Sequence, residues 1–187
     1  MKTNITDAKI VILATNGFEE SELTEPIKAL KDAGAVVQVI APEAGEIQGF
    51  RHFEKGATVR VDKQLADARA KDYDALVLPG GLANPDALRV NASALDLIRE
   101  FARAGKVIAA ICHAPWLLAD AGLLNGRTMT SVPTIRKDME NAGAKWLDEP
   151  VVVDNGFVTS RTPKDLAAFN AKLIEEISEG RHQRKVA

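Results

Sequence analysis

The sequence predicts an α/β fold in which a mostly parallel sheet carries helices on both faces. Two patterns in the chain indicate this class. Short apolar runs rich in β-branched residues lack polar alternation, as expected for strands that are buried on both sides. These runs alternate with segments of helical spacing, and the order strand, helix, strand is that of a right-handed parallel crossover.

The composition of the 187 residues is typical of a globular protein, with 46% hydrophobic and 27% charged residues. A chain of this length can bury a substantial core without disulfides or a structural metal. No internal repeat, low-complexity stretch or linker divides the sequence. We therefore expect one domain over residues 1–187.

The charge and the apolar runs limit the expected partners and location. A formal net charge of -2 gives no general attraction to nucleic acid or to an acidic membrane, so neither is expected as a partner. Apolar runs such as residues 107–111 are far too short to cross a bilayer. The first residues lack the long apolar core of a signal peptide, which predicts a cytoplasmic protein.

The N-terminal part of the chain predicts a strand at residues 8–14, a helix that closes at Gly34, and a second strand at residues 35–40. Residues 41–70 are less regular because glycines interrupt them. Here we expect short hairpin strands that lie off the main sheet, and a polar helical stretch around Leu65.

The middle of the chain predicts two further buried strands. The strand at residues 74–78 runs into a Pro-Gly-Gly turn that contains Gly80 and Gly81. One helix is predicted over residues 87–104, because apolar positions recur on one face and a glycine follows. The fourth strand, residues 107–111, comes next.

The C-terminal part predicts a helix, a short strand, a helix at residues 134–141, and a hairpin within residues 151–160 whose turn is Asn155-Gly156. Pro163 opens the last helix, and residues 181–187 are expected to fray. Together these elements predict a flavodoxin-like, doubly wound domain with short accessory hairpin strands.

Three features coincide with the predicted strand ends, where ligands bind in folds of this kind. They are an acidic loop after the first strand, the glycine pair after the third strand, and Cys112 after the fourth strand. Because the carboxyl ends of parallel strands meet at one edge of the sheet, a functional site is predicted there.

Cys112 is the only cysteine, which excludes an intrachain disulfide. It is predicted on the turn before a helix that Pro115 opens. The unpaired N–H groups at a helix start stabilise an anion and lower a thiol pKa, and His113 adds an imidazole. These features indicate a reactive thiolate, and the alternative is an inert buried cysteine that packs as a small hydrophobic residue.

A resemblance to a known family is carried by four motifs between about residues 10 and 177: G-F-E-E-S-E-L, D-A-L-V-L-P-G-G, A-I-C-H-A-P-W-L-L and V-T-S-R-T-P-K-D-L-A-A-F. Together they resemble the PfpI family of intracellular proteases and general stress proteins. That family belongs to the superfamily of the Parkinson-disease-linked protein deglycase and the class I glutamine amidotransferase domains.

The resemblance implies that Cys112 is a nucleophile on a strained elbow, with His113 as its imidazole and Glu22 as a buried carboxyl group facing the sulfur. Gly81 and His113 would supply the two N–H donors of an oxyanion hole. In the protease-like branch an acidic residue after the glycine pair orients the histidine, in some members across a subunit contact, and Asp86 is the nearest match. A homodimer or higher homo-oligomer is also implied.

The sequence departs from the family pattern near the expected site. One extra residue precedes Asp86, and this position is aspartate where glutamate can occur. Ala114 stands where glycine is usual, and Val132 where an aromatic residue is frequent. The pocket is therefore expected to differ in shape.

Glu22 shares its segment with three other acids, Glu19, Glu20 and Glu25, most of which are expected in solvent or near the positive end of the helix dipole. If Glu22 is buried beside Cys112, the loss of hydration favours its protonated form. A protonated carboxyl group can donate a hydrogen bond to a thiolate or a sulfenate.

Other kinds of site lack the residues they need. A glutaminase triad requires a separate downstream histidine, yet the chain has only His52, His113 and His182. No phosphate-binding glycine loop follows a strand, and no recurring Cys/His spacing marks a metal site. We expect neither a cofactor nor a bound metal.

Three functions remain open at this point. In the first, the protein is a stress-response hydrolase whose Cys112 attacks a carbonyl of a peptide, a glycated protein or a small 2-oxoaldehyde. In the second, it is a redox sensor or chaperone whose cysteine is oxidised to sulfenic or sulfinic acid. In the third, the cysteine is inert and the domain is an interaction scaffold, which the meeting of three features at the strand ends disfavours.

Overall fold

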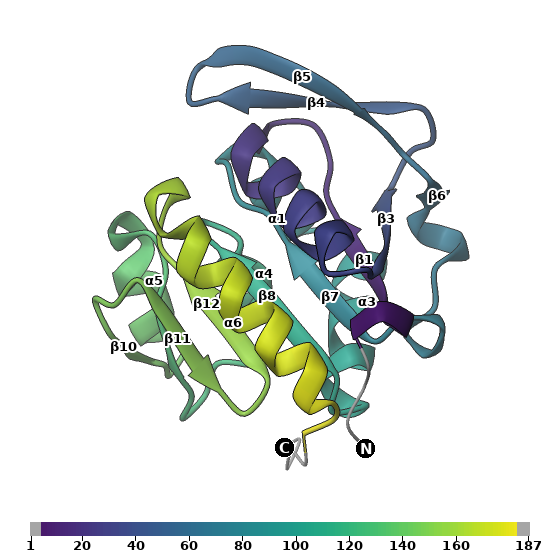
Figure 1. Cartoon of the computed structure of the whole chain (residues 1–187). Helices are drawn as coiled ribbons and strands as arrows, with labels where there is room; N and C mark the ends of the chain where they lie inside the picture. The colour runs from purple at the N-terminus through teal and green to yellow at the C-terminus, as the bar shows by residue number, and fades with distance from the viewer. Residues whose placement is uncertain (1–4, 183–187) are drawn as a thin grey trace.

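A central sheet of 7 strands organises the molecule, for which a computed structural model describes residues 5–182 (Figure 1). All neighbouring strands pair in parallel except the antiparallel pair β11–β12. The predicted mostly parallel sheet is confirmed. The spatial order of the strands is β11 (Val151–Asp154), β12 (Phe157–Ser160), β8 (Val107–Ile111), β7 (Ala75–Leu78), β1 (Lys9–Leu13), β3 (Val36–Ala41) and β6 (Lys63–Gln64).

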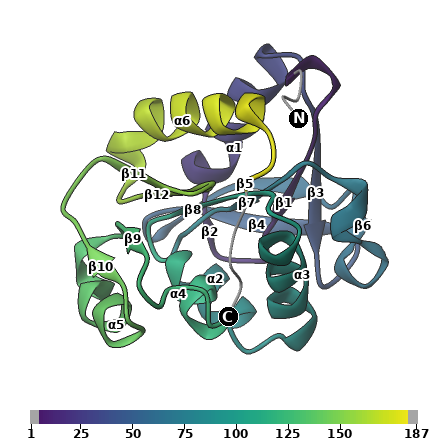
Figure 2. The ribbon, with the colours of Figure 1, turned by 90° about the horizontal axis from the view of Figure 1, so that it is seen from below.

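Helices cover both faces of this sheet, as the doubly wound prediction requires. Figure 2 shows α1 (Glu20–Asp32) and α6 (Leu166–Glu179) together on one side. The opposite side carries the other four α-helices of the described residues: α2 (Ala83–Leu88), α3 (Ala92–Arg103), α4 (Pro115–Asp120) and α5 (Arg136–Asn141). Residues 5–182 also contain five 3-10 turns: Ile5–Asp7, Leu65–Asp67, Ala70–Asp72, Pro133–Ile135 and Pro163–Asp165.

The core has two layers because alternate side chains of β1 point to opposite faces. Ile10 and Ile12 belong to the cluster that contains the buried residues of α1 and α6. Val11 and Leu13 belong to the cluster that contains those of α3 and α4. All four side chains are fully buried, which explains why the strand sequence shows no polar alternation.

A second sheet, with 3 strands, lies beside the first helix. In it β4 (Glu46–Arg51) and β5 (Glu54–Arg60) form an antiparallel hairpin (Figure 1). A third strand, β2 (Phe18–Glu19), pairs with β4 in parallel. The predicted hairpin off the main sheet is confirmed. Glu20, at the start of α1, accepts hydrogen bonds from Arg51 and from the Ala57 N–H, so the hairpin is attached to the beginning of this helix.

The single helix predicted over residues 87–104 is wrong. The chain forms α2 and α3 instead, because Asn91 has an extended backbone and its side chain accepts a hydrogen bond from the Ala94 N–H at 3.1 Å. This is an N-cap, and it begins a new helix. The polar helical stretch predicted around Leu65 is also wrong, since only a 3-10 turn forms there.

The C-terminal part agrees with the prediction in its elements and differs at their ends. Both predicted helices begin with a 3-10 turn that a proline opens, at Pro133 and at Pro163. A strand that was not predicted, β10 (Lys145–Trp146), pairs with the predicted short strand β9 (Thr128–Met129).

The tail expected to fray is ordered at least as far as His182, whose N–H donates to the Gly105 carbonyl at 2.8 Å. Residues 183–187 lie outside the described part. None of the helices within residues 5–182 combines the length and the apolar character needed to cross a membrane.

We predict that Asn91→Ala lowers the free energy of unfolding by about 1 kcal/mol, because α3 loses the acceptor for one of its first N–H groups. Urea denaturation followed by circular dichroism measures this change. Ser93→Ala, an exposed substitution in the first turn of the same helix, serves as the control. Equal stability of the two variants would show that the cap does not stabilise this helix.

Candidate functional site

Cys112 lies where β8 ends and the chain turns toward α4, and its backbone φ is 65°. This left-handed region costs a non-glycine residue about 1–2 kcal/mol. Two hydrogen bonds hold the residue there. The Cys112 N–H donates to the Ser160 carbonyl at 3.1 Å, and the Val132 N–H donates to the Cys112 carbonyl at 3.0 Å. The strained elbow implied by the sequence is therefore present, and such maintained strain is common at functional sites.

The glycine turn after β7 brings backbone N–H groups against the sulfur. Gly81 has φ 77°, and a Cβ there would lie 2.4 Å from the Gly17 carbonyl oxygen. A Cβ on Gly80 would lie 2.6 Å from the Cβ of Cys112. The backbone N–H groups of Gly81 and His113 lie near the sulfur and favour its charged form, so they act to lower the pKa of the thiol. These are the two donors predicted for an oxyanion hole.

Glu22 is fully buried and lies beside this turn. Its Oε2 accepts a hydrogen bond from the Gly80 N–H at 2.9 Å, and its carboxyl group interacts with the Cys112 thiol. Its Oε1 has no geometric hydrogen-bond partner among the described residues. Burial, with a smaller contribution from Glu19, raises the pKa of Glu22 to about 8. The carboxyl group is thus protonated at neutral pH, in agreement with the sequence hypothesis.

Cys112 and His113 are both kept neutral by their surroundings. Burial raises the pKa of the Cys112 thiol, although the nearby backbone N–H groups of Gly81 and His113 oppose this effect. Burial also lowers the pKa of His113. The lowered thiol pKa expected from the helix start is wrong, because only 9% of Cys112 is exposed and the loss of hydration outweighs the donors.

The imidazole of His113 has a partner for each nitrogen. Its Nδ1 lies 3.2 Å from the Cys112 sulfur. Its Nε2 lies 3.5 Å from the Thr134 hydroxyl oxygen. The ring also lies beside Trp116, with 5.2 Å between ring centroids and planes inclined by 53°. The indole N–H of Trp116 donates to Asp138 at 2.8 Å, which holds the second ring in place.

Comparison with known proteins identifies the relatives of this arrangement. The model of the DJ-1/PfpI family matches residues 8–176. The chain belongs to the DJ-1/PfpI family. It is 45% identical over 166 residues to "Putative cysteine protease YraA" of Bacillus subtilis, covering 89% of this chain and 96% of the relative.

Two further similar proteins place the chain in the same group. It is 42% identical over 167 residues to "Deglycase PfpI" of Pyrococcus furiosus, covering 89% of this chain and 98% of the relative. A two-domain protein of Anabaena variabilis, with DJ-1/ThiJ/PfpI-like and ferritin-like domains, superposes with a TM-score of 0.87 and 36% identity. That match covers 93% of this chain and 49% of the other.

Asp86, the residue that the family resemblance implied as the partner of His113, is exposed on α2. Within residues 5–182 of one chain, no hydrogen bond or ion pair joins Asp86 to His113. Asp86 therefore does not orient His113 by a direct hydrogen bond within the described part of the single chain. The role of Asp86 stays a prediction.

Three residues of the site were missed from the sequence. Asn84 is fully buried, donates to the carbonyls of Pro79 and Gly80, and so fixes the glycine turn. Trp116 follows His113 by three positions at a helix start, a spacing that brings two side chains to one face and could have indicated the contact. Thr134 gave no signal, because it reaches His113 from another segment of the chain.

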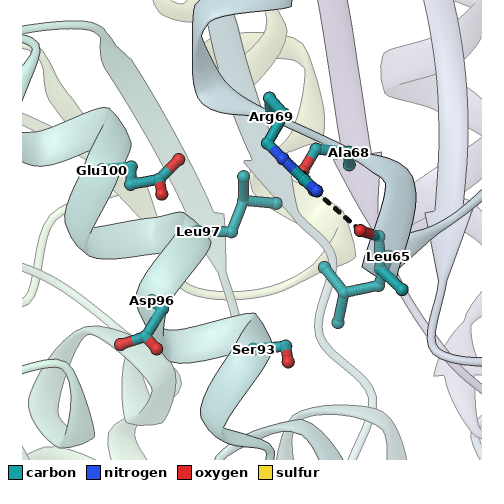
Figure 3. Close-up of a pocket in the computed structure, with 8 residues that line it drawn as sticks. Leu65, Ala68, Arg69, Ser93, Asp96, Leu97 and Glu100 are labelled. Carbon is teal, nitrogen blue, oxygen red and sulfur yellow. Dashed lines mark hydrogen bonds between the residues drawn. The ribbon is translucent and has the colours of Figure 1, made fainter.

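Two other groups of residues in this family member lie apart from the elbow. A hollow between α3 and the turn at Leu65 is lined by Arg69, Asp96 and Leu97 (Figure 3). Arg69 donates hydrogen bonds to the carbonyls of Ala66 and Ala68. The single group with metal-ligand spacing in the described part is Glu176, Glu179 and His182, near the end of α6. Neither group includes a residue of the candidate site.

We predict that the folded protein loses stability relative to Glu22→Gln as the pH rises from about 4.5 toward 8. Folded Glu22 retains a proton that the unfolded chain releases above the ordinary glutamate pKa of 4.5, so each pH unit in this window favours unfolding. The expected slope is about 1.4 kcal/mol per pH unit. Urea denaturation at several pH values measures it.

The control for this experiment is Glu25→Gln, which changes an exposed carboxyl group on the same helix. Its stability should follow that of the unaltered protein across the window. Parallel pH profiles for the unaltered protein and Glu22→Gln would contradict a protonated, buried Glu22.

Proposed function

We propose that the protein is a cysteine-dependent hydrolase in which Cys112 attacks a substrate carbonyl. The observation that carries the proposal is the geometry of the elbow. The sulfur lies 3.2 Å from an imidazole nitrogen. The nearby backbone N–H groups of Gly81 and His113 favour negative charge at this position. A nucleophile, a proton acceptor and paired oxyanion donors are the groups that acyl transfer requires. Relatives named as a cysteine protease and as a deglycase support the same class.

The first step follows from the neutral thiol and imidazole. As the sulfur forms a bond to the carbonyl carbon, the thiol proton passes to Nδ1 of His113. The π electrons of the carbonyl move onto its oxygen, where the N–H groups of Gly81 and His113 stabilise the negative charge. The imidazolium then returns its proton to the leaving group, and water releases the acyl group from the sulfur.

The substrate class follows from this chemistry. Peptides, glycated side chains and small 2-oxoaldehydes all offer an electrophilic carbonyl, and attack on each uses the same residues. With a 2-oxoaldehyde, addition of the sulfur gives a hemithioacetal in place of an acyl intermediate. We also infer a homodimer or higher assembly, on the basis of the family resemblance.

We predict that Cys112→Ser abolishes turnover of methylglyoxal, a glycated peptide or an unfolded protein, whichever the unaltered protein converts. His113→Gln should lower the rate about a hundredfold or more, because the general base is lost. Product formation measured by chromatography tests both variants. Ser93→Ala, remote from the elbow, should retain full activity, whereas turnover by Cys112→Ser would remove the cysteine from the mechanism.

A second candidate function, redox sensing, is favoured by the buried Glu22 carboxyl group beside the sulfur, whose Oε1 lacks a geometric partner among the described residues. A protonated carboxyl group at this position can donate a hydrogen bond to a sulfenate or sulfinate oxygen.

For this second candidate we predict that peroxide converts Cys112 to sulfinic acid in the unaltered protein and in Glu22→Gln, which keeps a donor. Glu22→Leu should give less of this product because it has no donor. Intact-protein mass spectrometry measures the yield. Equal yields from the glutamine and leucine variants would exclude Glu22 from stabilising the oxidised sulfur.

A further inference from the structure

We propose that Thr134 is the positioning residue of His113: its hydroxyl oxygen accepts a hydrogen bond from Nε2–H, so that the unprotonated Nδ1 faces the Cys112 thiol. This assignment rests on the proposed function, in which His113 accepts the thiol proton. It differs from the family resemblance, which implied an acidic residue as the group that orients the histidine.

The two contacts of the imidazole involve both of its nitrogens, and either tautomer can satisfy them. A neutral imidazole has one N–H donor and one acceptor nitrogen, and the partner of one nitrogen decides the role of the other. At 3.2 Å from the sulfur, Nδ1 can accept the thiol proton only if the ring proton is on Nε2. Thr134 Oγ1 lies 3.5 Å from Nε2. A hydroxyl group can donate or accept, and in the proposed arrangement it accepts from Nε2–H.

Thr134 is held close to the elbow by the backbone around it. It lies in the 3-10 turn Pro133–Ile135, which the preceding Val132 attaches to the elbow by donating its N–H to the Cys112 carbonyl at 3.0 Å. Ile135 anchors the other end in the core and is only 3% exposed. The 3.5 Å separation is long for a hydrogen bond, and catalytic hydrogen bonds of this kind shorten when substrate binds.

The Trp116 ring restricts the rotation of His113 from the other side. Its centroid lies 5.2 Å from that of the imidazole, and the bond from its indole N–H to Asp138 fixes its own orientation. The guanidinium group of Arg89 lies over the Trp116 ring, with its Cζ 4.8 Å from the ring centroid. The imidazole is therefore confined between the sulfur, the tryptophan ring and the threonine hydroxyl.

A hydroxyl acceptor has a different electrostatic effect from a carboxylate. A carboxylate bonded to Nε2 would favour the imidazolium and so raise the pKa of His113. The uncharged Thr134 hydroxyl has no such effect, and burial therefore lowers the pKa of His113. The charged side chains Arg89 and Asp138 contact Trp116 rather than the imidazole. His113 thus remains a neutral base, as the neutral thiol of Cys112 requires.

The first test is the side-chain ¹⁵N NMR spectrum of His113, which reports directly which ring nitrogen carries the proton. Only 3 histidines are present, so His52→Gln and His182→Gln assign the signals. Above the His113 pKa, the unaltered protein and Thr134→Ser should show protonated Nε2. Thr134→Val, which has the same shape without a hydroxyl group, should show a mixture of tautomers.

The second test is the rate constant for alkylation of Cys112 by iodoacetamide at neutral pH. Loss of one hydrogen bond predicts a rate roughly two- to tenfold lower in Thr134→Val, with recovery in Thr134→Ser. The matched control is Thr58→Val, the same change at an exposed position on β5. It should alter neither the tautomer nor the rate.

An unchanged tautomer in Thr134→Val would overturn the proposal. If the tautomer changed in Asp86→Asn instead, the orienting role would belong to Asp86. The NMR readout needs no turnover, so it separates the two proposals. If His113 depends on Thr134 but no substrate is converted, then the hydrolase proposal fails and the positioning role stands.

Discussion

Cys112 keeps its left-handed backbone because two distant segments bond to it, and the rest of the site depends on that constraint. The carbonyl of Ser160 comes from β12, which pairs with β8, and the N–H of Val132 comes from the loop that carries Thr134. The same hydrogen bonds therefore fix the nucleophile, align it with the sheet and bring the proposed partner of His113 into reach. If φ of Cys112 relaxed to an ordinary value, the sulfur would move, its alignment with the sheet would be lost, and Thr134 would shift away from His113.

A second consequence of this packing is that the sulfur and the Glu22 carboxyl group share a buried space. Gly80 separates them without a side chain, since a Cβ there would lie 2.5 Å from Glu22 Oε2. Placing two negative charges in this space would be costly, so both groups hold their protons. In the proposed hydrolase, the nearby N–H groups are then available to stabilise the charge that develops on a substrate oxygen.

Sequence reasoning predicted the main sheet well because its strands are buried on both faces and lack polar alternation. It failed at Asn91 because apolar spacing continues from Leu88 to Ile98, while the break comes from one side-chain hydrogen bond. Within the site, Cys112, Glu22 and Gly81 could be placed by motif and strand end. Thr134 and the raised thiol pKa could not, because one depends on how a distant loop folds back and the other on depth of burial.

Because the Cys112 thiol and the His113 imidazole are both neutral at rest, the rate at which Cys112 reacts depends on the kind of electrophile it attacks. In the proposed hydrolase, attack with the proton still on sulfur requires its simultaneous transfer to His113 and a carbonyl oxygen placed at the Gly81 and His113 N–H groups. An imidazole 3.2 Å from the sulfur serves this proton transfer directly. That contact is the reason for proposing hydrolysis first among the functions of this site.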